Sequence, residues 1–189
     1  RRQYYAIEIP KQISEKGIQG SQFYVFQALN ELRQIATIPE ALTEGRIESG
    51  KCELLVEQLL DTLANGHKAL VFVNFLAAIE SISTRLDEAG VGYVTMTGAT
   101  RDREAIVDRF QNDPDCRVFL LTLKTGGSGL NLTAADTIFL YDPWWNAAAE
   151  NQAIDRAHRI GQTNKVHAYK LIAEGSIEEK ILQLQDLKK

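Results

Sequence analysis

The sequence predicts an α/β fold with a mostly parallel sheet that is covered by helices on both faces. Five short apolar runs alternate along the chain with longer stretches of helical periodicity, and such alternation is typical of βαβ units. The chain has 189 residues, which is enough to bury one substantial core. We therefore expect a single three-layer α/β/α domain.

The elements before the sheet follow from the positions of glycine, proline and leucine. Residues 1–20 are predicted to form a loop, and residues 21–36 a helix that stops before Pro39. Leu55, Leu59 and Leu63 recur every four residues and predict an amphipathic helix over 51–64, which Gly66 ends.

Within the sheet region, the apolar runs predict five strands and the stretches between them three helices. The strands are expected at 69–73, 93–96, 118–122, 137–141 and 166–171, and the helices at 76–89, 101–111 and 147–159. A last helix is predicted after Ser176, in a capping box with Glu179, with Ile177, Ile181 and Leu184 on its buried face. We divide the chain into an N-terminal loop and helical segment (1–48), the α/β domain (49–175) and a C-terminal helix (176–189).

Charge and cysteine usage exclude several classes of protein. The net charge is -4, so any nucleic-acid site must be a local basic patch. Cys52 and Cys116 lie far apart without a neighbouring Cys or His cluster, which predicts neither a disulfide framework nor a zinc site and favours a reducing compartment. The longest apolar stretch, 69–79, is well short of the roughly 20 residues that cross a bilayer.

The run QAIDRAHRIGQ at 152–162 contains the most specific polar pattern. Arg156 and Arg159 are three residues apart, so on the predicted helix they would share a face. A guanidinium is permanently charged and matches phosphate oxygens in shape, which predicts a phosphate-binding pair. A solvated charged helix face is the alternative.

Six motifs follow one another along the chain: LNELRQIATIP (29–39), VFVNF (71–75), TGATRDR (97–103), LLTLKTGGSGLNLTAADTIFLYDPWWN (120–146), QAIDRAHRIGQ (152–162) and EGSIEEKILQLQ (174–185). This ordered set resembles the second lobe of the Swi/Snf-type remodelling ATPases, double-stranded DNA translocases of helicase superfamily two. The last resembles the brace helix of that family. One departure is Ala147, where the family usually has proline. The resemblance implies a RecA-like lobe.

In that family ATP lies between two lobes, and the resemblance implies the following nucleotide-side residues. Arg156 and Arg159 would reach the phosphates, with Arg159 the expected arginine finger, and Gln152 would orient the nucleotide. Gly127 and Gly129, in the TGGSG stretch, are expected on the nucleotide side of the cleft, although an ordinary tight turn would use glycines too. Asp155 is either functional or a salt-bridge partner.

The same resemblance implies contacts with the backbone of double-stranded DNA. Thr122 and Lys124 are expected to face the DNA. Gly98, Thr100 and Arg101, at a predicted helix N-terminus, would hold a phosphate, unless they form only an N-cap. Asn74 is a weaker candidate and could equally be a satisfied residue at a loop start. Trp144 and Trp145 are expected to pack and not to stack on bases.

Two further patterns mimic the rest of an ATPase site. GRIESGK at 45–51 fits a phosphate loop, but Cys52 stands where Ser or Thr should bind magnesium and no strand precedes it. DEAG at 87–90 ends a predicted amphipathic helix instead of a buried strand. The resemblance implies that the true phosphate loop and acidic box belong to a first lobe. ATP and Mg²⁺ are expected to be bound mainly there, with no metal site here, and this chain alone should not hydrolyse ATP.

Two other functions stay open at this point. One is a non-catalytic nucleic-acid-binding or regulatory module, which would have no need of the arginine pair. The other is a lobe of a strand-separating helicase. The expected partners are double-stranded DNA and the first lobe, without a membrane, and the expected location is the nucleus or the bacterial nucleoid in the cytoplasm.

Overall fold

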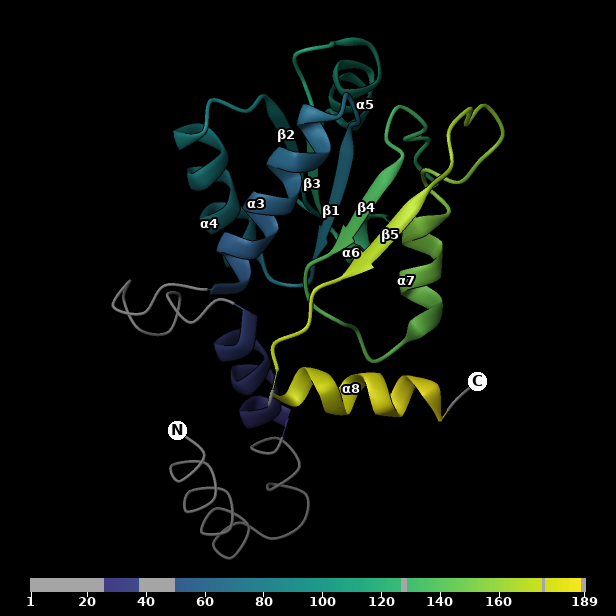
Figure 1. Ribbon diagram of the computed structural model, residues 1–189. Helices are drawn as coiled ribbons and strands as arrows, with labels where there is room; N and C mark the ends of the chain where they lie inside the picture. Colours follow the sequence, from purple (N-terminus) through teal and green to yellow (C-terminus); the bar gives the residue numbers. More distant parts are fainter. Residues whose placement is uncertain (1–25, 38–49, 127–128, 175, 188–189) are drawn as a thin grey trace, which may run out of the picture.

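A five-stranded parallel sheet forms the centre of the computed structural model, which describes residues 26–37, 50–126, 129–174 and 176–187 (Figure 1). The strands are β1 (Ala69–Val73), β2 (Tyr93–Met96), β3 (Val118–Thr122), β4 (Thr137–Leu140) and β5 (His167–Lys170), in the order β2-β3-β1-β4-β5. Every pair of neighbours is parallel. The predicted parallel sheet and its five strands are therefore confirmed.

Two helical layers cover this sheet. The helices are α3 (Gly50–Ala64), α4 (Leu76–Glu88), α5 (Arg103–Asn112), α6 (Leu123–Gly126), α7 (Ala147–Ile154) and α8 (Ile177–Asp186), together with a helix at residues 26–37. Val71 on β1 packs in the cluster that contains α3 and α4, whereas Phe72 packs in the cluster that contains α5 and α7. Because a strand alternates its side chains between faces, β1 is buried on both sides, as its unbroken apolar run predicts.

Close backbone contact joins β2 to the turn before β3 at Gly92. A Cβ atom added there would lie 2.0 Å from the Asp115 carbonyl oxygen, and the Gly92 carbonyl accepts a hydrogen bond from the Arg117 N–H (2.8 Å). Only glycine fits this crossing point without displacing the backbone.

The C-terminal helix α8 presents a different face from the one predicted. Ile181 is buried, as expected, but Leu184 is 45% exposed, and the polar residues Glu178 and Gln185 take the inner positions. Glu178 accepts hydrogen bonds from Lys51 and from the Thr37 hydroxyl, and Gln185 donates to the Trp144 carbonyl. Buried polar partners from other elements therefore outweigh the apolar periodicity.

At the start of α8, Ser176 is the N-cap, as predicted, but its hydroxyl accepts from the Glu178 N–H and not from Glu179. None of the described helices is both long and apolar enough to cross a membrane.

Candidate functional site

The motif residues expected on the DNA side lie where the strands end. Parallel strands bring their carboxyl ends to one edge of a sheet, and open α/β sheets bind ligands there. Asn74 follows β1, the 97–103 motif follows β2, and Thr122 ends β3. A hollow of about 320 Å³ at this edge is lined by Val73, Asn74, Thr122, Leu123, Lys124, Trp144 and Ala149. The structure thus brings three of the predicted residues, Asn74, Thr122 and Lys124, together.

Two positively charged side chains at this edge have no partner among the residues that the structure describes. Lys124 and Arg101 are exposed, and neither makes a hydrogen bond or ion pair with any residue that the structure describes. Next to Lys124, the Thr122 and Thr125 hydroxyl oxygens are 2.6 Å apart. This edge therefore offers a local positive charge on a chain of net negative charge.

The 97–103 motif differs in detail from the prediction. Helix α5 begins at Arg103, not at residue 101, because the Asp102 carboxylate caps it by accepting from the Ala105 N–H (3.2 Å). The Thr100 hydroxyl accepts from the Thr97 N–H (2.9 Å), which closes a turn before the helix. Gly98 is exposed in this turn. Gly98, Thr100 and Arg101 therefore precede the helix instead of forming its first turn.

Asn74 is satisfied within the protein. Its side-chain nitrogen donates to the Asp142 carboxylate (2.7 Å) and to the Asp142 carbonyl (3.1 Å), and its backbone N–H donates to the same carboxylate (3.1 Å). These bonds agree with a satisfied residue at a loop start, and a contact of Asn74 with DNA stays a prediction.

The predicted helix at 147–159 is wrong in its second half, and this removes the helical premise for the arginine pair. Helix α7 ends at Ile154, and residues 155–161 are turns. Mostly long-range bonds hold these turns: the Arg156 carbonyl accepts from the Leu132 N–H (3.0 Å), and the Gln162 side-chain amide donates to the carbonyls of Thr133, Ala135 and Ala157. Gly161 has a φ of 101°. Local turn bonds, such as those from the Ala157 and His158 N–H groups to the Ile154 carbonyl, and contacts with 129–135 therefore take the place of a continuous helix.

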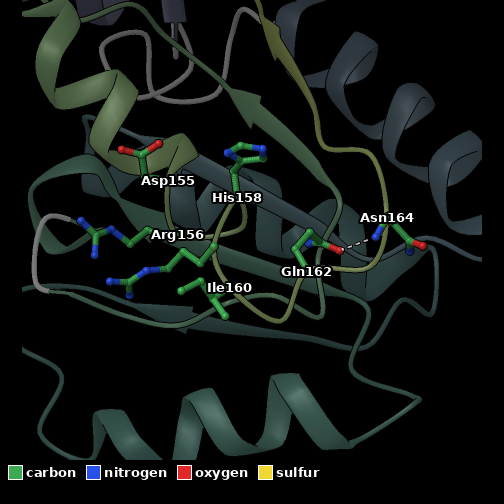
Figure 2. Close-up of a pocket in the computed structure, with 7 residues that line it drawn as sticks. Asp155, Arg156, His158, Ile160, Gln162 and Asn164 are labelled. Carbon is green, nitrogen blue, oxygen red and sulfur yellow. Dashed lines mark hydrogen bonds between the residues drawn. The ribbon is translucent and has the colours of Figure 1, made fainter.

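Arg156 and Arg159 nevertheless line one hollow. Its volume is about 610 Å³, and its lining residues are Asp155, Arg156, His158, Arg159, Ile160, Gln162 and Asn164, most of them labelled in Figure 2. Arg156 donates from Nε to the Gln152 carbonyl (3.1 Å). Arg159 donates from Nη1 to the carbonyls of Gly129 and Leu130 (both 3.1 Å).

These bonds gather most of the predicted nucleotide-side residues. Gly129, which has a φ of 78°, meets Arg159, and Gln152 meets Arg156, whereas Gly127 lies outside the described residues. Each guanidinium keeps at least two N–H-bearing nitrogens without a partner in the described part of the chain. The site can therefore still donate several charge-assisted hydrogen bonds to an anion.

The two candidate surfaces lie at opposite ends of the sheet. In Figure 1 the arrowheads of β4 and β5 point toward α8, and the connection from α7 to β5, which carries the arginines, lies at the other end. The Asn164 side chain donates to the Asp136 carboxylate, just before β4 (3.0 Å). The residues predicted to bind the nucleotide and those predicted to bind DNA thus lie on distinct surfaces.

The described residues of the two motifs that resemble a phosphate loop (45–51) and an acidic box (87–90) have structural roles. Lys51 donates to the Glu178 carboxylate (2.5 Å) and to the Tyr141 carbonyl (2.9 Å), so its charge is used inside the protein. Asp87 and Glu88 end α4 as exposed residues before Gly90. Within the described ranges no group of three or more acidic, His or Cys side chains could hold a metal ion.

Sequence reasoning missed Arg33 and Asp142, which form a buried ion pair (3.4 Å) 109 residues apart. Burial raises the pKa of Asp142 from 3.8 to about 6, while bonds from Asn74 and the charges of Lys51 and Arg33 oppose the rise. Burial likewise lowers the pKa of Arg33, against the pull of Asp142 and Glu178. A signal for Asp142 was present in the sequence, because a carboxylate directly after a buried strand needs a partner.

Comparisons with known proteins agree on one family. A sequence model described as the helicase conserved C-terminal domain matches residues 50–161. The chain is 37% identical over 182 residues to an uncharacterized ATP-dependent helicase of Mycoplasma pneumoniae, which covers 95% of this chain and 17% of that protein. It is 36% identical over 173 residues to helicase swr1 of Schizosaccharomyces pombe, covering 88% of this chain and 13% of that protein.

A solved structure agrees with these relatives. The crystal structure of the C-terminal part of the Fun30 ATPase domain matches with a TM-score of 0.70 and 30% identity, over 93% of this chain and 62% of that chain. By comparison, the chain spans less than a fifth of the length of the Mycoplasma pneumoniae and Schizosaccharomyces pombe relatives.

Proposed function

The chain belongs to the helicase conserved C-terminal domain family, as the C-terminal RecA-like lobe of a Swi/Snf-type ATPase, and on that premise we propose that it is the second motor lobe of an ATP-dependent double-stranded DNA translocase. ATP and Mg²⁺ would be bound mainly by a first lobe, and this lobe would complete the site. The proposed division at residues 48 and 175, and a nuclear or nucleoid location, remain predictions.

The observation that carries the proposal is the shared hollow of Arg156 and Arg159. The two side chains are anchored to backbone carbonyls through different atoms, Nε in one and Nη1 in the other, so they present their remaining donors from fixed positions. Fixed cationic donors stabilise the charge that develops during phosphoryl transfer. Gln152 and Gly129 border the pair, and Gly127 stays a prediction from the motif.

On the opposite surface we assign the DNA backbone. Lys124 and Arg101 supply exposed charge, and Thr122, Gly98 and Thr100 supply hydroxyl and backbone groups nearby. Such donors suit phosphates and not base edges. Binding should therefore tolerate any sequence and weaken as salt concentration rises.

ATP hydrolysis by the intact parent protein, with and without duplex DNA, tests the proposal. Arg159→Ala is expected to lower the DNA-stimulated rate by about 10³-fold or more, the scale of an arginine finger. Arg109→Ala, an exposed arginine on α5, is the matched control and should leave the rate unchanged. The isolated 189-residue chain should show only background hydrolysis. A parent that no duplex stimulates, or an Arg159→Ala protein with full activity, would contradict the assignment.

A further inference from the structure

Asp142 is a buried carboxylate at the end of β4 that was not predicted to contact ATP or DNA. It is 4% exposed and lies in the loop from β4 to α7. Two other segments converge on it: the helix at 26–37 through Arg33, and the residue after β1, Asn74. The charges around it are Arg33 on that helix, Lys51 on α3 and, beyond these two, Glu178 on α8. Asp142 therefore links the helix at 26–37 to the edge of the sheet where the strands have their carboxyl ends.

Asn74 is held by Asp142 in a way that decides what it can offer to a ligand. Its side-chain nitrogen donates to a carboxylate oxygen and to a carbonyl oxygen of Asp142. A carbonyl and an ionised carboxylate only accept, so the orientation of the amide follows from its partners. The remaining polar atom of the side chain, Oδ1, is an acceptor. Phosphate oxygens are acceptors too, and Asn74 therefore cannot donate to a DNA phosphate while Asp142 holds it.

Arg33 binds Asp142 and also contacts the loop that follows Asp142. Its guanidinium donates to the Pro143 carbonyl (3.2 Å) and lies over the rings of Phe75, Trp144 and Trp145 at 5.1, 4.8 and 5.7 Å. Trp144 is also a wall of the hollow that Asn74, Thr122 and Lys124 line. The Arg33–Asp142 pair thus contacts two residues that line the hollow: Asp142 binds Asn74, and Arg33 packs on Trp144.

A buried ion pair is a poor way to gain stability, because desolvation of both charges offsets much of their attraction. The opposed pKa changes of Arg33 and Asp142 have this cause. What such a pair can provide is one defined arrangement of the groups bonded to it.

We propose that Asp142 is a positioning residue for DNA binding: with Arg33 it holds Asn74 and Trp144 as fixed walls, between which Thr122 and Lys124 meet the phosphate backbone. This inference rests on the proposed function, since it names residues that shape the proposed DNA surface. In this inference Asn74 supports the shape of the DNA surface, and Thr122 and Lys124 make the phosphate contacts.

Binding of a short fluorescein-labelled duplex to the 189-residue chain tests the inference. Asp142→Asn removes a negative charge near DNA, which by charge alone would tighten binding. Positioning predicts the opposite sign, a loss of about three- to tenfold, within the range of coupling between contacting residues. Asp136→Asn is the matched control: it removes a charge from another buried aspartate, 3% exposed, at the far end of β4, and should not weaken binding.

Salt dependence and a double variant separate positioning from direct contact. Lys124→Ala should lower the slope of log affinity against log salt by about 1, whereas Asp142→Asn and Asn74→Ala should leave the slope unchanged. The Asp142→Asn/Asn74→Ala protein should bind no more weakly than the weaker single variant, because both changes break one arrangement. Losses that multiply would mean that Asn74 contacts DNA itself, and would overturn the inference.

A structural readout keeps the inference separate from the proposed function. In nuclear magnetic resonance spectra the indole N–H signals of Trp144 and Trp145 should move in Asp142→Asn and stay in Asp136→Asn. If the unchanged chain binds no duplex, the DNA half of the proposed function fails, and unmoved indole signals would then overturn the positioning role as well. If Asp142→Asn does not fold, Asn74→Ala, which keeps the Arg33 pair, supplies both measurements. Unchanged or tighter binding by Asp142→Asn would overturn the inference directly.

Discussion

Removing the Lys51 charge should destabilise the fold strongly, because this lysine of the GRIESGK run forms a buried ion pair with Glu178. Its side chain is 5% exposed and its Glu178 partner 1% exposed. Burial lowers the pKa of Lys51, and the Glu178 charge and hydrogen bond resist that change. In Lys51→Met the Glu178 carboxylate would lose this cationic donor and keep the neutral donors Thr37 hydroxyl and Ala173 N–H.

Loss of one partner of a buried ion pair costs about 3–5 kcal/mol, because the other charge stays buried without compensation. We expect Lys51→Met to lower the free energy of unfolding by that amount in urea titrations. Thr37 and Ala173 donate to different oxygens of Glu178. Glu178→Gln keeps a single acceptor oxygen for these two donors and leaves Lys51 without its charged partner, so it should cost a similar amount. The double variant leaves neither charge alone, and it should be more stable than the sum of the single effects predicts, by about 1 kcal/mol or more.

A surface pair is the matched control for this measurement. Arg109 and Asp113 are 3.6 Å apart on α5, with side chains 57% and 35% exposed. Exposed pairs of this kind contribute about 0.3–0.5 kcal/mol, so Arg109→Met should be nearly neutral. An effect of Lys51→Met no larger than that of Arg109→Met, or strictly additive single variants, would refute the reasoning.

Three further predictions concern the amide network, the backbone crossing and pH. Gln162→Ala removes the donor to three carbonyls, and it should destabilise the protein by about 1–3 kcal/mol and speed amide hydrogen exchange in residues 155–162; protection equal to that of the unchanged chain would contradict this. Gly92→Ala places a Cβ 2.0 Å from the Asp115 oxygen, so it should cost about 1–3 kcal/mol or more in urea titrations, whereas Gly50→Ala, with open space around it, should be neutral or stabilising. Because the folded pKa of Asp142 is about 6, above its ordinary 3.8, the folded state binds this proton more tightly, and the contribution of Asp142 to stability should fall by about 3 kcal/mol as pH rises from about 4 to 6. Asp142→Asn should remove that slope, and an identical pH profile in the two proteins would show that the carboxyl does not titrate there.

The strands could be predicted closely because each is a local apolar run. The predicted bounds of β1, β2 and β3 agree with the structure residue for residue, and those of β4 and β5 differ only at their ends. The predicted helix over 51–64 is confirmed, with Leu55 and Leu59 buried and Leu63 partly buried. Such periods report burial directly, since one face of each element must leave water.

The end of α7 and the buried face of α8 could not be predicted, because distant groups decide them. After Ile154 the Arg156 carbonyl and the Gln162 side chain bond to residues 132–135, which no local rule brings near. In α8 the inner positions of Glu178 and Gln185 depend on Lys51, Thr37 and Trp144, all far away in sequence. Helical periodicity predicts that the apolar face of a helix is buried. It contains no information about polar partners on other elements.

The sequence by itself determined the family, the parallel sheet and the two sets of motif residues, because ordered motifs and apolar periods are properties of consecutive residues. Only the tertiary structure decided that the arginines share one hollow at the far end from Lys124, that Asn74 gives its amide to Asp142, and that Arg33 and Lys51 are internal counter-ions. Hydrogen bonds and buried ion pairs join residues up to 141 positions apart, and their energies depend on distance, burial and geometry. Those quantities exist only once the chain has folded.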